Sequence, residues 1–156
     1  MEIFQYISGD QWTESILAQQ VDRPRYEQAL NRGLPFKTIV AFGSNAAKPY
    51  YFPTNQSNTE ITNKNLILID SGGHYLDGTA SVARTIHLGK PTSAQRRAYT
   101  NILMGMIRLS MLAFPETLKP AELDTLIREP LWSAKEDYPH ISGSGIGSYL
   151  SVEECK

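Results

Sequence analysis

The chain has 156 residues and a mass of 17.5 kDa, which suits one ordinary domain and is too little for two. Its 15 basic and 16 acidic side chains give a net charge of −1, a balance that does not favour nucleic acid or an anionic membrane as partner. One cysteine, Cys155, excludes an internal disulfide and a thiolate-rich metal cage, and no apolar stretch reaches the roughly 20 residues that cross a bilayer. We therefore expect a cytoplasmic protein with a single domain over residues 1–156.

Residues 10–32 are the first region with helical character. Asp10 is a candidate N-cap, good helix formers follow it, and Gly33 ends the pattern. Pro24 should kink this helix or divide it into two, because proline lacks the amide hydrogen that a helix interior uses.

Two strands are predicted next. Residues 36–42 are aromatic and β-branched, and residues 43–45 supply a turn after them. Residues 66–69 form a short unbroken apolar run, which is typical of a strand buried on both faces. This second strand brings Asp70 into the interior or into a cleft.

A β-hairpin is predicted after Asp70. An Asp-Gly pair lies within residues 74–82, and such a pair is a strong hairpin signal, so we expect a tight turn at residues 77–78. Residues 85–88 continue the second arm, and residues 89–91 stop it.

Two helices follow the hairpin. Thr92 or Ser93 can cap a helix over residues 93–113, which Pro115 ends, and Pro120 opens a shorter helix. In the first helix the residues that fall near one face are Tyr99, Ile102, Leu103, Met106, Ile107, Ser110 and Ala113, and in the second Leu123, Leu126 and Ile127 are expected to face inward.

The last segment combines glycines with strand-like residues. Three glycines lie within residues 143–147, and residues 149–152 alternate like a strand whose partner we expect to be missing. Helices on either side of a hairpin make the predicted fold class α+β.

Several segments resemble the catalytic domain of aminopeptidase P, the Xaa-Pro aminopeptidase family of pita-bread metallopeptidases. They are residues 36–39, 43–47, 49–51, 70–79, 84–85 and 140–147. The likeness is collinear over nearly the whole chain. It implies a pita-bread α+β fold, incomplete at the C-terminus, and a parent chemistry in which two divalent metal ions, usually manganese, release the residue before a proline.

The resemblance also implies where metal ligands would lie. The family's pattern has two aspartates, one histidine and two glutamates. Asp70 matches the first aspartate, Ser81 stands where the second is expected, and Ser144 stands where the ligand histidine is expected. Both glutamates fall beyond Lys156, so Asp70 alone of the five ligands remains.

The family's pocket histidines are mostly replaced as well. Tyr50 and Glu153 stand where two of them are expected, and His140, the first histidine of the glycine-rich motif, is retained as the candidate catalytic residue. Because a serine hydroxyl is a poor substitute for carboxylate or imidazole, we expect no bound manganese here.

Other side chains could rebuild a single-metal site from Asp70, His74 and Glu153. If the hairpin pairs residue 76 with 79, His74 faces Ser81 and lies roughly 13 Å from Asp70 along the strand. We expect His74 and His87 to be solvent-facing or hydrogen-bonded, and Asp77 to serve the turn. For Asp70 we expect a partner in Arg84 or in the amides around Gly72 and Gly73.

The sequence thus predicts a truncated aminopeptidase P-like domain that is catalytically inactive. One alternative is an interaction module that binds a proline-containing peptide, a second copy or a full-length homologue. Another is a residual single-metal aminopeptidase that releases the residue before proline.

Overall fold

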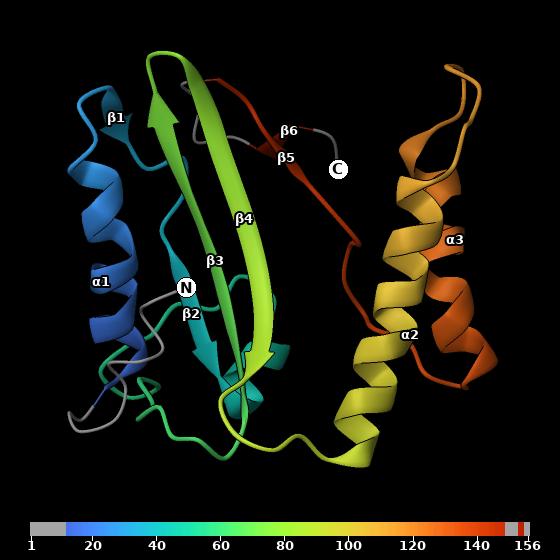
Figure 1. The fold of residues 1–156 in the computed structure, drawn as a ribbon, viewed down its shortest axis with the longest axis horizontal. Coiled ribbons are helices and arrows are strands. Elements are labelled where there is room, and N and C mark those ends of the chain that lie inside the picture. The colour runs from blue at the N-terminus through green and yellow to red at the C-terminus, as the bar shows by residue number, and fades with distance from the viewer. Residues whose placement is uncertain (1–11, 149–152, 155–156) are drawn as a thin grey trace. The chain divides into compact units, whose positions relative to one another are not determined.

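The computed structural model describes residues 12–148 and 153–154, and the chain divides into two compact units. The first comprises Met1–Lys90 with Ile146–Glu153, and the second comprises Pro91–Gly145 with Glu154–Lys156. Figure 1 shows the order of elements, in which a helix and a sheet precede a pair of helices. This mixture confirms the α+β class. That the two units act as a single domain stays a prediction.

The first helix, α1, comprises Glu14–Tyr26 and begins at a different cap from the one expected. Thr13 is the N-cap, and its side chain accepts a hydrogen bond from the Ile16 amide, whereas Asp10 lies outside the described residues. Pro24 does not divide the helix, because it lies in the last turn, and the helix ends two residues later.

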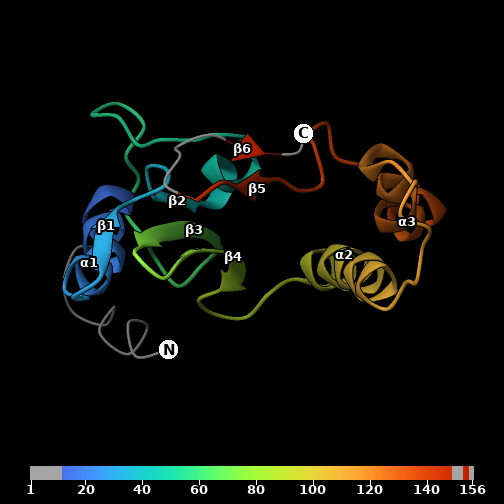
Figure 2. The same cartoon turned by 90° about the horizontal axis from the view of Figure 1, so that it is seen from above.

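The sheet of the first unit has four antiparallel strands (Figures 1 and 2). They are β1 (Asn31–Gly33), β2 (Ile39–Phe42), β3 (Leu66–Tyr75) and β4 (Gly78–His87). β3 pairs with β1 and β2 along one edge and with β4 along the other. Gly33 therefore ends a strand and not the helix. A short 3₁₀ helix, η2 (Gly43–Ala47), provides the turn that was expected after β2.

The β3–β4 hairpin is confirmed, but its register differs from the expected one. Tyr75 pairs with Gly78, so the turn is formed by residues 76–77, and Gly72 faces Ser81 in place of His74. Neither Asp77 nor Gly78 takes a positive φ, so the mirror-image turn that Asp-Gly pairs favour is not formed here. The Asp-Gly signal located the hairpin and misplaced its turn by one residue.

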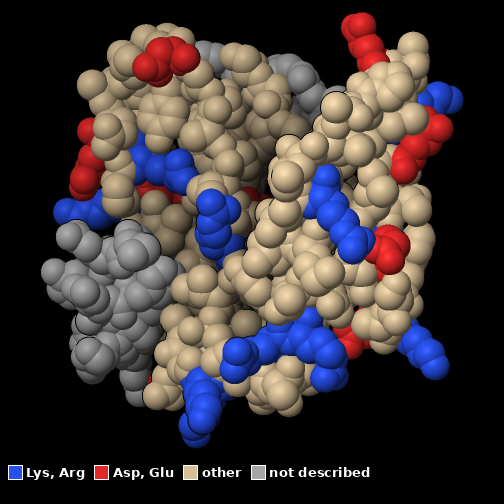
Figure 3. All heavy atoms as spheres, turned by 45° about the vertical axis from the view of Figure 1, so that its right-hand side comes forward, with Lys and Arg blue, Asp and Glu red and all other residues tan. Residues whose placement is uncertain are grey.

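The second unit is built on two packed helices, α2 (Ser93–Ser110) and α3 (Pro120–Ser133). Thr92 caps α2 in a capping box with Gln95, and Pro120 opens α3, as the sequence predicts. Large apolar side chains of α2 stay exposed, and uncharged residues dominate the face drawn in Figure 3. Leu126 of α3, expected to face inward, is 36% exposed.

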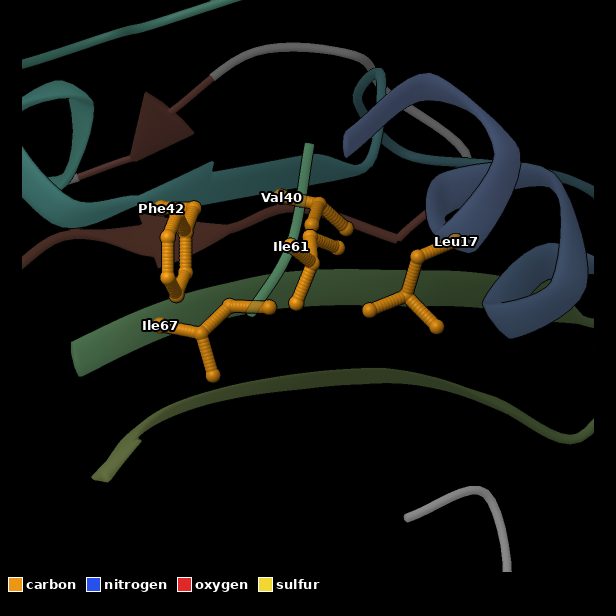
Figure 4. Packing of buried hydrophobic residues seen from close by; sticks show 5 residues of the cluster. All are labelled: Leu17, Val40, Phe42, Ile61 and Ile67. Atoms are coloured by element: carbon orange, nitrogen blue, oxygen red, sulfur yellow. The ribbon is translucent and has the colours of Figure 1, made fainter. Parts of the chain in front are cut away.

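The core of the first unit lies between α1 and the sheet. Its buried members are Leu17, Val40, Phe42, Ile61 and Ile67, which Figure 4 shows pointing toward one another. Val40 and Phe42 pair with alternate residues of β3, so they lie on the same face of the sheet as Ile67. Burying each such side chain contributes about 1.5–3 kcal/mol, which holds α1 against this face.

The chain ends in a two-stranded sheet of β5 (Gly145–Ile146) and β6 (Glu153–Glu154). The strand expected over residues 149–152 lies outside the described residues. Of the helices within residues 12–148, none is both long and apolar enough to span a membrane.

Candidate functional site

Asp70 and Ser81 lie on one face of the β3–β4 hairpin, the face away from the core. Gly72 pairs with Ser81 and Asp70 pairs with Ala83, so Asp70 and Ser81 are diagonal neighbours on adjacent strands. Such neighbours are typically about 7–8 Å apart. In the expected register Ser81 would have faced His74, which lies roughly 13 Å from Asp70 along the strand. The register therefore brings the retained aspartate and the serine at the second aspartate position together.

Gly72 is required at this point of the face. A Cβ there would lie 2.6 Å from Pro35 Cγ and 2.8 Å from the Ala80 carbonyl oxygen, closer than side chains tolerate. Pro35 and Phe36 therefore lie over the strand beside Asp70, and only glycine leaves room for them.

Helix α1 fixes the backbone at Asp70 from the opposite face of the sheet. Thr38, next to the residue that pairs with Asp70, donates a hydrogen bond to the Asp22 carboxylate. Arg25 donates to the Ser71 hydroxyl at 2.9 Å. Since Ser71 is buried, this charge-assisted bond and the Asp22 bond hold both strands that meet at Asp70.

Arg84 does not fit its predicted pairing with Asp70. It is opposite Ile69 in the register, and therefore lies on the other face of the sheet, and its guanidinium donates to the Ala83 carbonyl at 2.8 Å.

The hairpin histidines make hydrogen bonds, as predicted. His74 is 5% exposed, and its Nδ1 is 3.0 Å from the Thr79 hydroxyl oxygen. His87 Nδ1 accepts from the Gly89 amide at 2.9 Å. Asp77 lies exposed in the turn. In the part of the chain that the structure describes, no group of three His, Cys, Asp or Glu side chains is arranged to hold a metal ion. The single-metal set of Asp70, His74 and Glu153 stays a prediction, because the side chain of Glu153 lies outside the described part.

A fully buried carboxylate, Glu14, organises the loop that carries Tyr50. It accepts hydrogen bonds from the amides of Phe42 at 2.6 Å and Thr59 at 3.0 Å, and from the Tyr51 hydroxyl at 2.6 Å. Asn45 Nδ2 also donates to it at 3.1 Å. Burial, followed by the hydrogen bond to Glu14, raises the pKa of the Tyr51 phenol.

Tyr50 lies next to Tyr51 of this network and is exposed to solvent. It is 60% exposed and its φ of 54° lies in the left-handed region, which costs a tyrosine on the order of 1 kcal/mol. Sequence reasoning missed Glu14, because a glutamate in the first turn of a helix usually faces solvent. The only signal was the polar residues at 45, 51 and 59, which lie far from it along the chain.

His140 belongs to a polar cluster of the second unit centred on Arg128. The Arg128 guanidinium donates to Asp124 at 2.7 Å and to Asp137 at 2.8 Å. It also donates to the carbonyl oxygens of Tyr138 at 2.7 Å and His140 at 2.6 Å. Arg128 thereby ties the segment that carries His140 to α3.

The charges of this cluster support one another. A hydrogen bond from Ser142, and then Arg128, lowers the pKa of the Asp124 carboxyl, and the bond to Asp124 raises the pKa of Arg128. The Arg128 guanidinium lies 4.1 Å from the centre of the Tyr138 ring, and the His140 ring stacks on Tyr138 with centroids 4.6 Å apart. His140 and Ser144 are both exposed.

Comparison with known proteins identifies relatives of this chain. The family model described as metallopeptidase family M24 matches residues 1–156. Xaa-Pro aminopeptidase 2 of Homo sapiens is 42% identical over 137 residues, which cover 88% of this chain and 20% of that protein. Aminopeptidase P1 of Arabidopsis thaliana is 39% identical over 142 residues, which cover 91% of this chain and 22% of that protein. The chain thus spans about a fifth of the length of these relatives.

Solved structures that resemble this chain include an X-prolyl aminopeptidase and a prolidase. An X-prolyl aminopeptidase of Caenorhabditis elegans, described as a cytosolic enzyme with a di-nuclear active site, matches with a TM-score of 0.88 and 38% identity over 96% of this chain and 25% of that chain. A prolidase from Pyrococcus furiosus matches with a TM-score of 0.69 and 26% identity over 80% of this chain and 36% of that chain. These likenesses confirm the pita-bread fold that the sequence predicts.

Proposed function

Because the chain belongs to metallopeptidase family M24 and its relatives are aminopeptidases P, we propose that it is an aminopeptidase P-like domain without catalytic activity of its own. The observation that carries this proposal is the pair Asp70 and Ser81 on adjacent strands. At the two hairpin positions where the family's pattern has aspartates, this chain has one aspartate and one serine.

The available donors do not fit a pair of divalent cations. Two dications about 3.5–4 Å apart repel each other by roughly 15–20 kcal/mol at an effective dielectric constant of ~20, which several anionic ligands must offset. Asp70 supplies one negative charge, and the hydroxyls of Ser81 and Ser144 supply none. No catalytic step through a metal therefore follows from these residues, and we propose that manganese does not bind here.

The test is an assay of the purified 156-residue chain with manganese and an Xaa-Pro peptide, together with elemental analysis of its metal content. We expect far less than one metal ion per chain and no release of the residue before proline. Turnover that is abolished both by a chelator and by Asp70→Ala would show an active enzyme and overturn the proposal.

A second candidate function is binding of proline-containing peptides without hydrolysis. The observation that favours it is the exposed imidazole of His140, which is held against Tyr138 and does not depend on a metal. Titration with the tripeptide Ala-Pro-Pro should shift the NMR signals of His140 and leave those of His87 unchanged. Equal shifts at both histidines, or none, would discard this candidate. By analogy with the C. elegans relative we also propose a cytosolic location.

A further inference from the structure

The hydrogen bond of His140 determines which of its ring nitrogens carries the proton. Nδ1 lies 2.8 Å from the carbonyl oxygen of Ile141. A carbonyl oxygen can only accept, so Nδ1 must be the donor and Nε2 of the neutral ring must hold a lone pair. Because His140 is exposed, this lone pair is available to a ligand. No donor to Nε2 is found among the described residues.

Arg128 holds the backbone on which this hydrogen bond depends. Its guanidinium donates to the carbonyl oxygens on either side of Pro139, those of Tyr138 and His140. The two carboxylates of Asp124 and Asp137 fix the guanidinium in turn, and its side chain is only 13% exposed. A planar fork of N–H donors can make all of these bonds at once.

Tyr138 limits the rotation of the imidazole. Its ring stacks on His140 at an interplanar angle of 28°. The same ring also contacts the Arg128 guanidinium. The Tyr138 hydroxyl also hydrogen-bonds to Ser142, which donates to Asp124. The segment from 137 to 142 is therefore bound to α3 at several points, and the ring of His140 rests on it.

We propose that Arg128 is a positioning residue that holds His140 as the Nδ1-protonated tautomer, with Nε2 presented as an acceptor for an N–H donor of a ligand. This proposal rests in part on the second proposed function, because the N–H groups of a peptide are donors of this kind. The tautomer itself requires neither a ligand nor a metal.

The chain contains a matched internal reference in His87. Its Nδ1 accepts from the Gly89 amide at 2.9 Å, so Nδ1 is unprotonated and Nε2 carries the hydrogen. The structure thus assigns opposite tautomers to two histidines of the same chain.

The first experiment is long-range ¹H–¹⁵N NMR of the ¹⁵N-labelled chain at about pH 8, where imidazoles are neutral. The chain has three histidines, and single substitutions of each assign the signals. We expect a pyrrole-type Nδ1 and a pyridine-type Nε2 for His140, and the reverse for His87. The same tautomer at both residues, or Nε2–H at His140, would overturn the proposal.

The second experiment removes the fork of donors. Arg128→Lys keeps the charge but cannot reach both carbonyls and both carboxylates, so we expect His140 to lose its single tautomer and His87 to keep its own. The control is Arg108→Lys, which changes another arginine that pairs with α3, through Glu129, without contact to residues 137–142. Helical amide signals of α3 report whether each variant folds. A wild-type His140 pattern in folded Arg128→Lys would refute the role of Arg128.

Titration of the wild-type chain with Ala-Pro-Pro separates this proposal from the function on which it partly rests. A fixed His140 tautomer with no response to the peptide would retain Arg128 as a positioning residue and remove peptide binding and the ligand role of Nε2. A response to the peptide without a fixed His140 tautomer would support peptide binding and refute the positioning role of Arg128.

Discussion

Ser81 is the residue at which the loss of the family's metal ligands can be tested directly. Ser81→Asp places a second carboxylate diagonally across from Asp70, and we expect the affinity for Mn²⁺ to rise about tenfold or more, which corresponds to roughly 1.4 kcal/mol. Isothermal titration calorimetry measures this.

Two controls accompany the Ser81 substitution. Ser81→Asn adds an oxygen ligand without charge, and Val82→Asp adds the same charge on the other face of the strand. Equal gains from Ser81→Asp and Val82→Asp would mean that the effect is a general one of net charge and that the Asp70 face holds no latent metal site.

Among the polar side chains of the first unit, Glu14 is expected to contribute most to the free energy of unfolding. Glu14→Gln removes the charge and turns an amide group toward donors that then have no acceptor, so we expect a loss of about 2–4 kcal/mol of unfolding free energy. Urea denaturation measures it, with the exposed Glu60→Gln as control. A change below about 0.5 kcal/mol would contradict a central role for this carboxylate.

Ser142 is expected to control the acid sensitivity of the second unit. Its hydrogen bond is the main cause of the lowered pKa of Asp124, so this carboxylate stabilises the folded unit above its ordinary pKa near 3.8, and the stabilisation is lost as the pH falls through the lowered value. Ser142→Ala should move the pKa of Asp124 upward toward the ordinary value, as measured by NMR titration. An unchanged Asp124 pKa would assign the effect to Arg128 alone.

At the level of elements, the contact between α2 and α3 depends on Gly105. A Cβ at this position would lie 2.3 Å from the Ile127 carbonyl oxygen, so Gly105→Ala must push the helices apart, and we expect a loss of about 1–3 kcal/mol. Thermal unfolding followed by circular dichroism checks this. Gly143→Ala, whose Cβ would meet no atom within 4 Å, is the matched control and should change little.

The elements themselves were largely predictable because their signals are local. Thr92 and Pro120 mark the two helices of the second unit, and the Asp-Gly pair marks the hairpin. The boundary of α1 and the turn of the hairpin were not predictable to the residue, because several residues compete for each cap and turn position.

The candidate site was predictable only in part. The motif around Asp70 identified which residue types stand at the ligand positions, but which strand positions face each other depends on a hairpin register that residue identities left open. Glu14 and Arg128 were missed for a different reason. The partners of Glu14 are distant from it along the chain, and those of Arg128 include carbonyl oxygens of irregular backbone. A repeating sequence pattern does not predict either kind of contact.

At the scale of the whole molecule, α2 and its C-cap residue, Met111, expose several large apolar side chains. Met111 is 80% exposed, Met106 57% and Ile107 48%. Contiguous apolar patches favour association, so we predict concentration-dependent self-association of the chain. Analytical ultracentrifugation measures it, and Met106→Lys should weaken it several-fold. A monomer at all concentrations up to the solubility limit would contradict the prediction and leave a proline-containing peptide and a full-length homologue as the remaining proposed partners.

The division of the chain into two units has a practical consequence for spectroscopy. Its two tryptophans are distributed one to each unit, with Trp12 packed against the core of the first and Trp132 46% exposed on α3 of the second. Each unit therefore carries an intrinsic fluorophore in a different environment. A variant that retains only Trp12 or only Trp132 lets the unfolding of either unit be followed by emission wavelength, without any attached dye.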